Sequence, residues 1–214
     1  MSTAQIPTLA IRVRQFAKQF QYSMIAALVL MSVWPARALA QDGHSHTSTT
    51  QQDQLTPDQK SKRSALLKIV RDSTARFKDV EEAEYEGYAL QFGCVSGPDA
   101  GAMGLHFVNG SLVSQGIVDA TRPQIVIYEP TPGGRLKLIG ADFLVLADQW
   151  NSDPKHTGPP ELMGQLFHLF DAPNRFGLPA FYTLHVWAWK ENPNGAFVNW
   201  HPNVSCEAFS GQNP

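Results

Sequence analysis

The spacing of apolar residues along the chain first predicts a long helix. Apolar side chains recur every three or four positions over residues 66–80, which places them on one face of a helix. Thr56 is a typical N-cap residue, a proline follows it, and Gln59 stands where a reciprocal capping box requires glutamine. We therefore expect one amphipathic helix from about Pro57 to Lys78, with its apolar stripe packed on a sheet.

After this helix the pattern changes to an alternation of apolar and polar residues, which indicates strands. Asn109-Gly110 is a strong signal for a tight turn, and the proline- and glycine-rich residues 130–134 predict a second turn. Residues 147–160 and 171–179 are predicted loops, and 161–170 a short helix or an irregular apolar plug. The predicted strands of this region are residues 88–94, 103–108, 124–128 and 135–146.

The most aromatic stretch of the chain, Phe181–Cys206, is predicted to form a hairpin. Its strands would cover residues 181–189 and 196–200, with a turn at 191–195. Both faces of the first strand are largely apolar, so this strand is expected inside a sheet that is covered on both sides. Because side chains alternate across a strand, one face would carry Phe181, Thr183, His185, Trp187 and Trp189.

A helix followed by antiparallel strands predicts the α+β class, with the amphipathic helix packed on one face of a curved antiparallel sheet. A cystatin-like or NTF2-like cone is one version of this architecture, and a small barrel capped by the helix is another. We expect residues 56–214 to form a single domain, because a chain of this length can bury one substantial core.

The first 40 residues have the features of a secretory signal peptide. They are basic and lack acidic residues, they include an apolar run at 24–34, and they end in Ala38-Leu39-Ala40, the small-x-small pattern of a cleavage site. The apolar run is too short to span a bilayer, so no stable membrane insertion is expected after cleavage. Residues 41–55 are polar without any apolar period, which predicts a disordered linker. The protein is therefore expected to be exported to the periplasm or secreted.

Charge and cysteine content narrow the expected partners and compartment. Without the four basic residues of the leader, the 17 basic and 19 acidic residues become 13 and 19, a formal charge of −6 with histidines neutral. Such a domain has no electrostatic reason to bind nucleic acid. Cys94 and Cys206 are predicted to form a disulfide, the default for two cysteines in an oxidising compartment.

Four groups of residues resemble a family of exported bacterial proteins of uncharacterised function. They are Met103-Gly104-x-His106-Phe107, the Tyr128-Glu129-Pro130…Gly134-x-Leu136 hairpin, Leu184-His185-x-Trp187-x-Trp189, and Asn192-Pro193-x-Gly195-x-Phe197…Trp200-x-Pro202-x-Val204-x-Cys206. The resemblance covers roughly residues 88–206. It implies a bacterial source and an exported setting, and it brings no activity, cofactor or catalytic residue.

Histidines among apolar residues make a metal site the first candidate for chemistry. Imidazole nitrogens suit copper or zinc, and thioethers favour Cu(I). Met103 stands three positions before His106 and Met163 five positions before His168, and neither spacing is a known tight motif. The candidate ligands are His106, His185 and His168, and the alternative is that each is a core histidine with a hydrogen-bonded partner. His44 and His46 form a His-x-His in the polar linker, where a solvated segment is the alternative to a metal-binding tail.

The second candidate is a ligand pocket, because a cone-shaped sheet can leave an apolar cavity with a polar group in its wall. Its residues would be His185, Trp187, Trp189 and His106. We expect an exported protein that binds a small molecule or metal ion and has no catalytic residues. The alternatives are a small enzyme in which Asp142 or Glu129 orients His185 as a base, and a structural or partner-binding module. No nucleophile motif supports the enzyme, and the acidic Asp142 on an apolar strand face is costly unless it is paired or near solvent.

Overall fold

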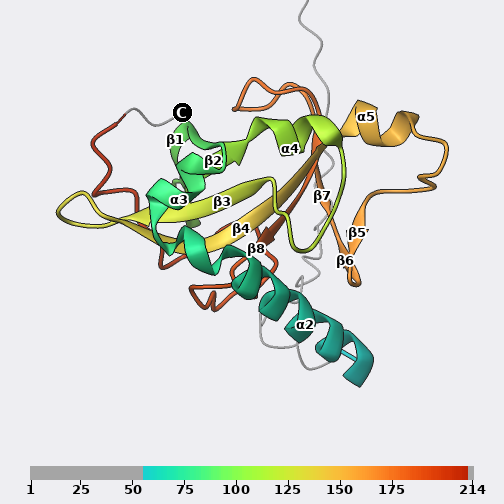
Figure 1. The fold of residues 1–214 in the computed structure, drawn as a ribbon, viewed down its shortest axis with the longest axis horizontal. Helices are drawn as coiled ribbons and strands as arrows, with labels where there is room; N and C mark the ends of the chain where they lie inside the picture. Colours follow the sequence, from blue (N-terminus) through green and yellow to red (C-terminus); the bar gives the residue numbers. More distant parts are fainter. Residues whose placement is uncertain (1–54, 212–214) are drawn as a thin grey trace, which may run out of the picture. The chain divides into compact units, whose positions relative to one another are not determined.

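The computed structural model describes residues 55–211, so the predicted leader and almost all of the predicted linker lie outside the described residues. Within the described part, a helix packs against a strongly curled antiparallel sheet, which confirms the α+β class (Figure 1). No helix of this part has both the length and the hydropathy needed to cross a bilayer.

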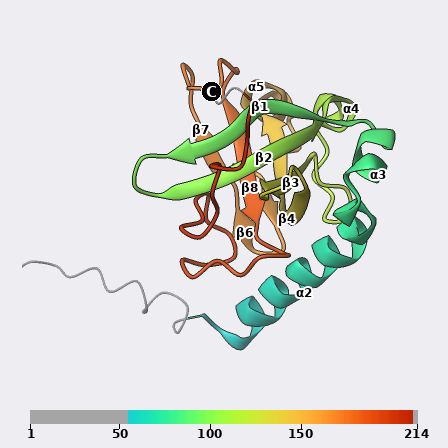
Figure 2. The ribbon, with the colours of Figure 1, turned by 90° about the vertical axis from the view of Figure 1, so that its left-hand side faces the viewer.

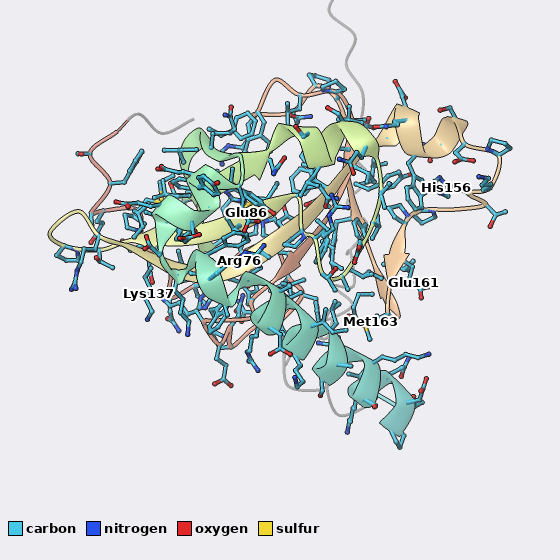
Figure 3. All side chains as sticks on the ribbon, in the orientation of Figure 1. Arg76, Glu86, Lys137, His156, Glu161 and Met163 are labelled. Carbon is cyan, nitrogen blue, oxygen red and sulfur yellow. A yellow bond between two sulfur atoms is a disulfide. The ribbon has the colours of Figure 1, made fainter. Side chains whose placement is uncertain are left out.

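The first helix begins as the sequence predicts. The Thr56 side chain accepts from the backbone N–H of Gln59, and the Gln59 side chain accepts from the backbone N–H of Thr56. The helix ends earlier than expected, because the chain tightens into a 3₁₀ turn and then forms a further short helix. Arg76 and Glu86, labelled in Figure 3, form an ion pair that ties this turn to the end of the short helix. The helical elements are α2 (Pro57–Thr74), η1 (Ala75–Lys78), α3 (Val80–Tyr85), α4 (Gly110–Gln115) and α5 (Ala147–Ser152).

Six strands form the curled sheet, in the order β1-β2-β3-β4-β8-β7, and all neighbouring pairs are antiparallel. The predicted hairpin of β3 and β4 is present, with its turn at residues 131–135. The strands are β1 (Tyr88–Gly97), β2 (Gly101–Asn109), β3 (Ile125–Pro130), β4 (Leu136–Leu146), β7 (His168–Phe170) and β8 (Phe181–Val186).

Four further local predictions are wrong. Residues 147–152, expected as part of a loop, form the short helix α5. Asn109 does not open a tight turn but caps α4, where its side chain accepts from the backbone N–H of Leu112. Residues 161–170 form neither a helix nor a plug but the two-stranded β5 (Glu161–Leu162) and β6 (Gln165–Leu166), followed by β7. The expected final hairpin is absent, because β8 stops at Val186 and residues 196–200 form no strand.

The two faces of the sheet pack against different partners. Leu66 and Val70 of α2 pack on one face against Phe143 of β4 and Leu184 of β8, as the position of α2 in Figure 2 illustrates. The opposite face carries a second apolar cluster, which includes Phe181. Strand β8 is therefore covered on both sides, as its two apolar faces predict.

A segment after β8 returns across the sheet to its other edge. His201 pairs with Ala102 at the start of β2, with backbone hydrogen bonds of 3.1 and 3.2 Å. Cys206 then forms a disulfide with Cys94 of β1, which confirms the predicted pairing. Residues 187–206 thus connect β8 to β1 and β2 by hydrogen bonds and one covalent bond.

Candidate metal centre

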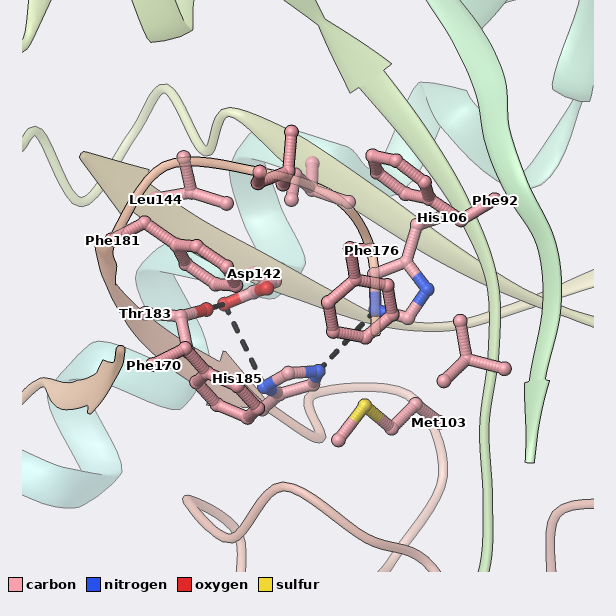
Figure 4. Close-up of a pocket in the computed structure, with 13 residues that line it drawn as sticks. Phe92, Met103, His106, Asp142, Leu144, Phe170, Phe176, Phe181, Thr183 and His185 are labelled. Atoms are coloured by element: carbon pink, nitrogen blue, oxygen red, sulfur yellow. Dashed lines mark hydrogen bonds and ion pairs between the residues drawn. The ribbon is translucent and has the colours of Figure 1, made fainter. Parts of the chain in front are cut away.

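Three polar side chains from three different strands meet inside the curl of the sheet. His106 lies on β2, Asp142 on β4 and His185 on β8, and their exposed fractions are 7%, 2% and 2%. Nitrogen or oxygen atoms from the three residues all lie within 4.8 Å of one another (Figure 4). A cluster of this composition and burial could hold a metal ion.

The curl of the sheet is what brings the two histidines together. Strands β3 and β4 lie between β2 and β8, so in a flat sheet the two histidine backbones would be about 14 Å apart. In the curled sheet Nε2 of His106 lies only 3.4 Å from Nε2 of His185. The histidines therefore project from the concave face, and α2 packs on the convex one.

The backbone fixes the proton position on His106. Its Nδ1 lies 3.2 Å from the carbonyl oxygen of Gly104, and because a carbonyl can only accept, Nδ1 is the protonated nitrogen. Nε2 then carries the lone pair and accepts a hydrogen bond from Nε2 of His185 when that nitrogen is protonated. Position 104 requires glycine, because its φ of +91° and the close approach of the Tyr128 carbonyl leave no room for a side chain.

Asp142 is held by hydrogen bonds from neighbours on β8 and on its own strand, β4. The hydroxyl of Thr183 donates to Oδ1 of Asp142 at 2.5 Å, and backbone hydrogen bonds from Phe143 and Leu184 add to this support. Nδ1 of His185 lies 3.7 Å from the same Oδ1, which is too long for a hydrogen bond. Among the described residues this buried Nδ1 has no hydrogen-bond partner. A buried polar atom without a partner in a native fold indicates an additional ligand or a small rearrangement.

Burial governs the ionisation of the cluster. Desolvation, reinforced by the charge of His185, lowers the pKa of His106 to about 4. Desolvation, reinforced by His168, lowers the pKa of His185 to about 3, although the side chain of Asn199 opposes this change. Desolvation raises the pKa of Asp142 to about 6, although His106 and the Thr183 hydroxyl oppose this change. At neutral pH both imidazoles are therefore uncharged, the state in which they bind metals.

A small cavity of about 30 Å³ adjoins the three residues. This volume is enough for one or two water molecules or an ion with one small ligand, and it is far below the roughly 300–1,000 Å³ of pockets for drug-sized molecules. Apart from the cluster and Thr183 its wall is apolar. The remaining lining residues are Phe92, Val95, Met103, Ile125, Leu144, Phe170, Phe176, Leu178 and Phe181.

Aromatic side chains complete the wall of this cavity from both edges of the sheet. Phe92 on β1 contacts Phe176 in the loop after β7, with ring centroids 5.5 Å apart. Phe170 and Phe181 stack at 5.1 Å on the other side. Phe92 has a φ of +65° within the irregular pairing of β1 with β2, and such bulges redirect side chains next to functional sites.

The structure brings together two of the residues that the sequence suggested as ligands. His106 and His185 meet, whereas His168 is exposed on β7 and lies outside the cluster. The sequence suggests the acidic member, Asp142, only as a partner that orients His185. Its position on an apolar strand face indicates either a partner or closeness to solvent, and its burial in the structure decides for a partner. Glu129, the other carboxylate considered for that role, instead pairs with Lys190 at 2.7 Å.

The two tryptophans do not share a face of the sheet. Trp187 lies beside the ring of His185, with centroids 6.0 Å apart, and donates from Nε1 to the carbonyl of Val198. Trp189 lies on the side of α2 and donates from Nε1 to the hydroxyl of Thr74. Neither is among the residues that line the cavity.

Comparison of the chain with protein-family models, with curated proteins and with solved structures gives no match.

Proposed function

We propose that this protein binds one transition-metal ion, copper or zinc, between His106 and His185, with Asp142 beside them, and that it does so without catalysis. The observation that carries the proposal is the 3.4 Å separation of the two Nε2 atoms. Two imidazole nitrogens at 2.0–2.1 Å from a tetrahedral metal lie about 3.4 Å apart. The separation of the two nitrogens, which share a hydrogen bond in the metal-free protein, therefore matches the edge of a tetrahedral site.

Two features of the cluster further support this proposal. The carbonyl of Gly104 keeps the proton of His106 on Nδ1, so Nε2 is available to a metal. The unpartnered Nδ1 of His185 faces Asp142, and a carboxylate that accepts from a metal-bound imidazole is a common arrangement around metal ions. Metal binding at Nε2 of His185 would place a proton on Nδ1 and give this atom a partner.

Catalysis by the His185–Asp142 pair has less support. The pair is almost completely buried, and the adjoining cavity of about 30 Å³ is too small for an organic substrate of ordinary size. The nearest hydroxyl, that of Thr183, already donates to Asp142 and is not free to act as a nucleophile. These observations favour binding of an ion over acid–base chemistry.

The test is metal titration of the full chain in a His44→Ala/His46→Ala background, which removes the His-x-His of the linker. Native mass spectrometry after metal depletion should show one ion per chain when Zn²⁺ or copper is added. His106→Asn and His185→Asn should each weaken binding by at least about 10-fold to 100-fold, because each removes one ligand. His168→Asn and His156→Asn are the matched controls and should bind as the parent does.

Two results would overturn the proposal. One is a parent protein that binds none of these ions. The other is binding that survives both His106→Asn and His185→Asn while circular dichroism shows the fold intact. In either case the cluster would be a hydrogen-bonded part of the core.

We also propose that the protein is exported. The Cys94–Cys206 disulfide supports this location, because disulfides persist in oxidising compartments, and so does the signal-like composition of residues 1–40. Amino-terminal sequencing of the protein from its native host should give a start at or near Gln41. An exported protein that retains Met1 would contradict the proposed removal of the leader.

A further inference from the structure

An irregularity in β2 places a thioether in the wall of the cavity. Val95 of β1 pairs with Gly104 and Ser96 pairs with Ala102, so Met103 is left without a partner and forms a β-bulge. In a regular strand Met103 and His106 would point to opposite faces, because they are three positions apart. The bulge and the left-handed backbone of Gly104 instead allow both side chains to line the same cavity.

The side chain of Met103 lies in the wall of the cavity that His106 and His185 also line. It is 2% exposed, and in Figure 4 it extends from β2 into the cavity on the side of His185. Thioether sulfur is a soft ligand that selects Cu(I), whereas zinc sites use thiolate, imidazole and carboxylate ligands. Two imidazoles and one thioether are a neutral set suited to a cuprous ion.

The charge balance of the cavity favours the same ion. Its wall is apolar apart from the cluster and Thr183, so an excess of charge inside is costly. One cuprous ion beside one ionised Asp142 gives a net charge of zero, whereas a divalent ion leaves one uncompensated positive charge. Asp142 is already held by Thr183 and lies opposite Nδ1 of His185, which suits it to accept the proton of that nitrogen.

We propose that Met103, His106 and His185 bind a cuprous ion and that Asp142 acts as a positioning residue for His185. This inference rests on the proposed metal site and specifies its ion. The bulge in β2 then allows the sulfur atom of Met103 to join the two histidines as a third ligand. A zinc site formed by His106, Asp142 and His185 is the competing arrangement.

The test compares Cu(I) and Zn²⁺ affinities of the full chain in the His44→Ala/His46→Ala background. Both are measured by competition with a chromophoric chelator under anaerobic conditions, with ascorbate as reductant so that the disulfide is preserved. Met103→Leu keeps the side-chain volume and should lower the Cu(I) affinity by at least about 10-fold, while the Zn²⁺ affinity changes by less than about 3-fold. Met163→Leu, which changes a methionine outside the cavity, is the matched control and should leave both affinities unchanged.

X-ray absorption at the copper edge provides the second measurement. The parent should show one sulfur neighbour of copper, and Met103→Leu should lack it. A Met103→Leu variant that binds Cu(I) as tightly as the parent, or a parent without a sulfur neighbour, overturns the inference. A protein that binds Zn²⁺ but not Cu(I) also overturns it and leaves the proposed metal site standing, whereas a protein that binds neither ion refutes both.

Discussion

Asp142 and His185 occupy directly paired positions on β4 and β8, and Oδ1 of the aspartate lies 3.7 Å from Nδ1 of the histidine. Burial acts on the two groups in opposite ways. It raises the pKa of Asp142 to about 6 and lowers that of His185 to about 3. The two residues therefore make opposite contributions to the stability of the metal-free protein as the pH falls.

Asp142→Asn should make the metal-free protein more sensitive to acid. His106 and His185 have folded-state pKa values below 6.5, so the stability they contribute is present above pH 6.5 and is lost as the pH falls toward about 4 and 3. Asp142 has a folded-state pKa above its ordinary 3.8, so between about pH 6 and 4 it takes up a proton in the folded state only and offsets part of this loss. The variant lacks that offset.

The expected difference is measurable by urea unfolding in the presence of a chelator. From pH 6 to pH 4 the free energy of unfolding should fall further in the variant than in the parent, by on the order of 1–3 kcal/mol. Glu129→Gln removes a carboxylate outside the cavity and serves as the control. Parallel pH curves for the parent and Asp142→Asn would show that Asp142 is ionised in the fold over this whole range.

Gly104→Ala should destabilise the protein more than Gly133→Ala. The two glycines have nearly the same φ, +91° and +89°, so both variants carry the cost of a left-handed alanine, about 1–3 kcal/mol. An added Cβ at Gly104 would lie 2.6 Å from the carbonyl oxygen of Tyr128, whereas the space around Gly133 is open within 4 Å. Denaturant melts give both values, and equal losses would mean that the strands can separate to admit the methyl group.

Removal of the disulfide should lower the free energy of unfolding by about 2–5 kcal/mol. Cys94 and Cys206 are 112 positions apart, and cross-links that close long loops restrict the unfolded chain most in the chain-entropy model. The measurement is urea unfolding of Cys94→Ala/Cys206→Ala beside the oxidised parent. Peptide mapping of the unreduced parent should recover the linked pair, and two thiols that alkylate freely after denaturation would contradict the pairing.

Trp189→Phe should weaken the fold and leave metal binding unchanged. The indole N–H donates to the hydroxyl of Thr74 at 3.0 Å, and the ring lies under the ammonium group of Lys78 at 4.1 Å, both on the side of the helices. Loss of the hydrogen bond should cost about 1 kcal/mol in thermal or urea unfolding. A change in metal affinity of more than about 10-fold, or 1.4 kcal/mol, would mean that the residue communicates with the cavity.

Elements whose signals are local were predictable from the sequence. The start of α2 depends on the hydrogen bonds between Thr56 and Gln59, which are three positions apart, and the β3–β4 hairpin depends on a glycine-rich turn between two apolar strands. The prediction of the final hairpin was wrong, because the backbone there forms hydrogen bonds with a distant strand and not with a neighbouring strand of the same hairpin. The backbone N–H groups of Trp189 and Lys190 bond to the carbonyl of Ile139 on β4 and draw the chain away from a regular strand.

The cluster was only partly predictable for a related reason. Strand alternation placed Asp142 on a costly face, and residue chemistry suggested His106 and His185 as ligands. Their meeting depends on the curl of the sheet across two intervening strands, which no pattern within a single strand encodes. Residue type also suggested Met103, but simple alternation places it on the face opposite His106, and only the bulge reverses this.

The position of the disulfide in the chain has a consequence for proteolysis. His106, Asp142 and His185 all lie between Cys94 and Cys206, inside one covalent ring of the polypeptide. A single cut in the exposed loop at 153–159 opens this ring without releasing a fragment, because both pieces stay joined through the two sulfur atoms. A nicked molecule would migrate as two bands only after reduction, and its three cluster residues would remain on one covalent framework.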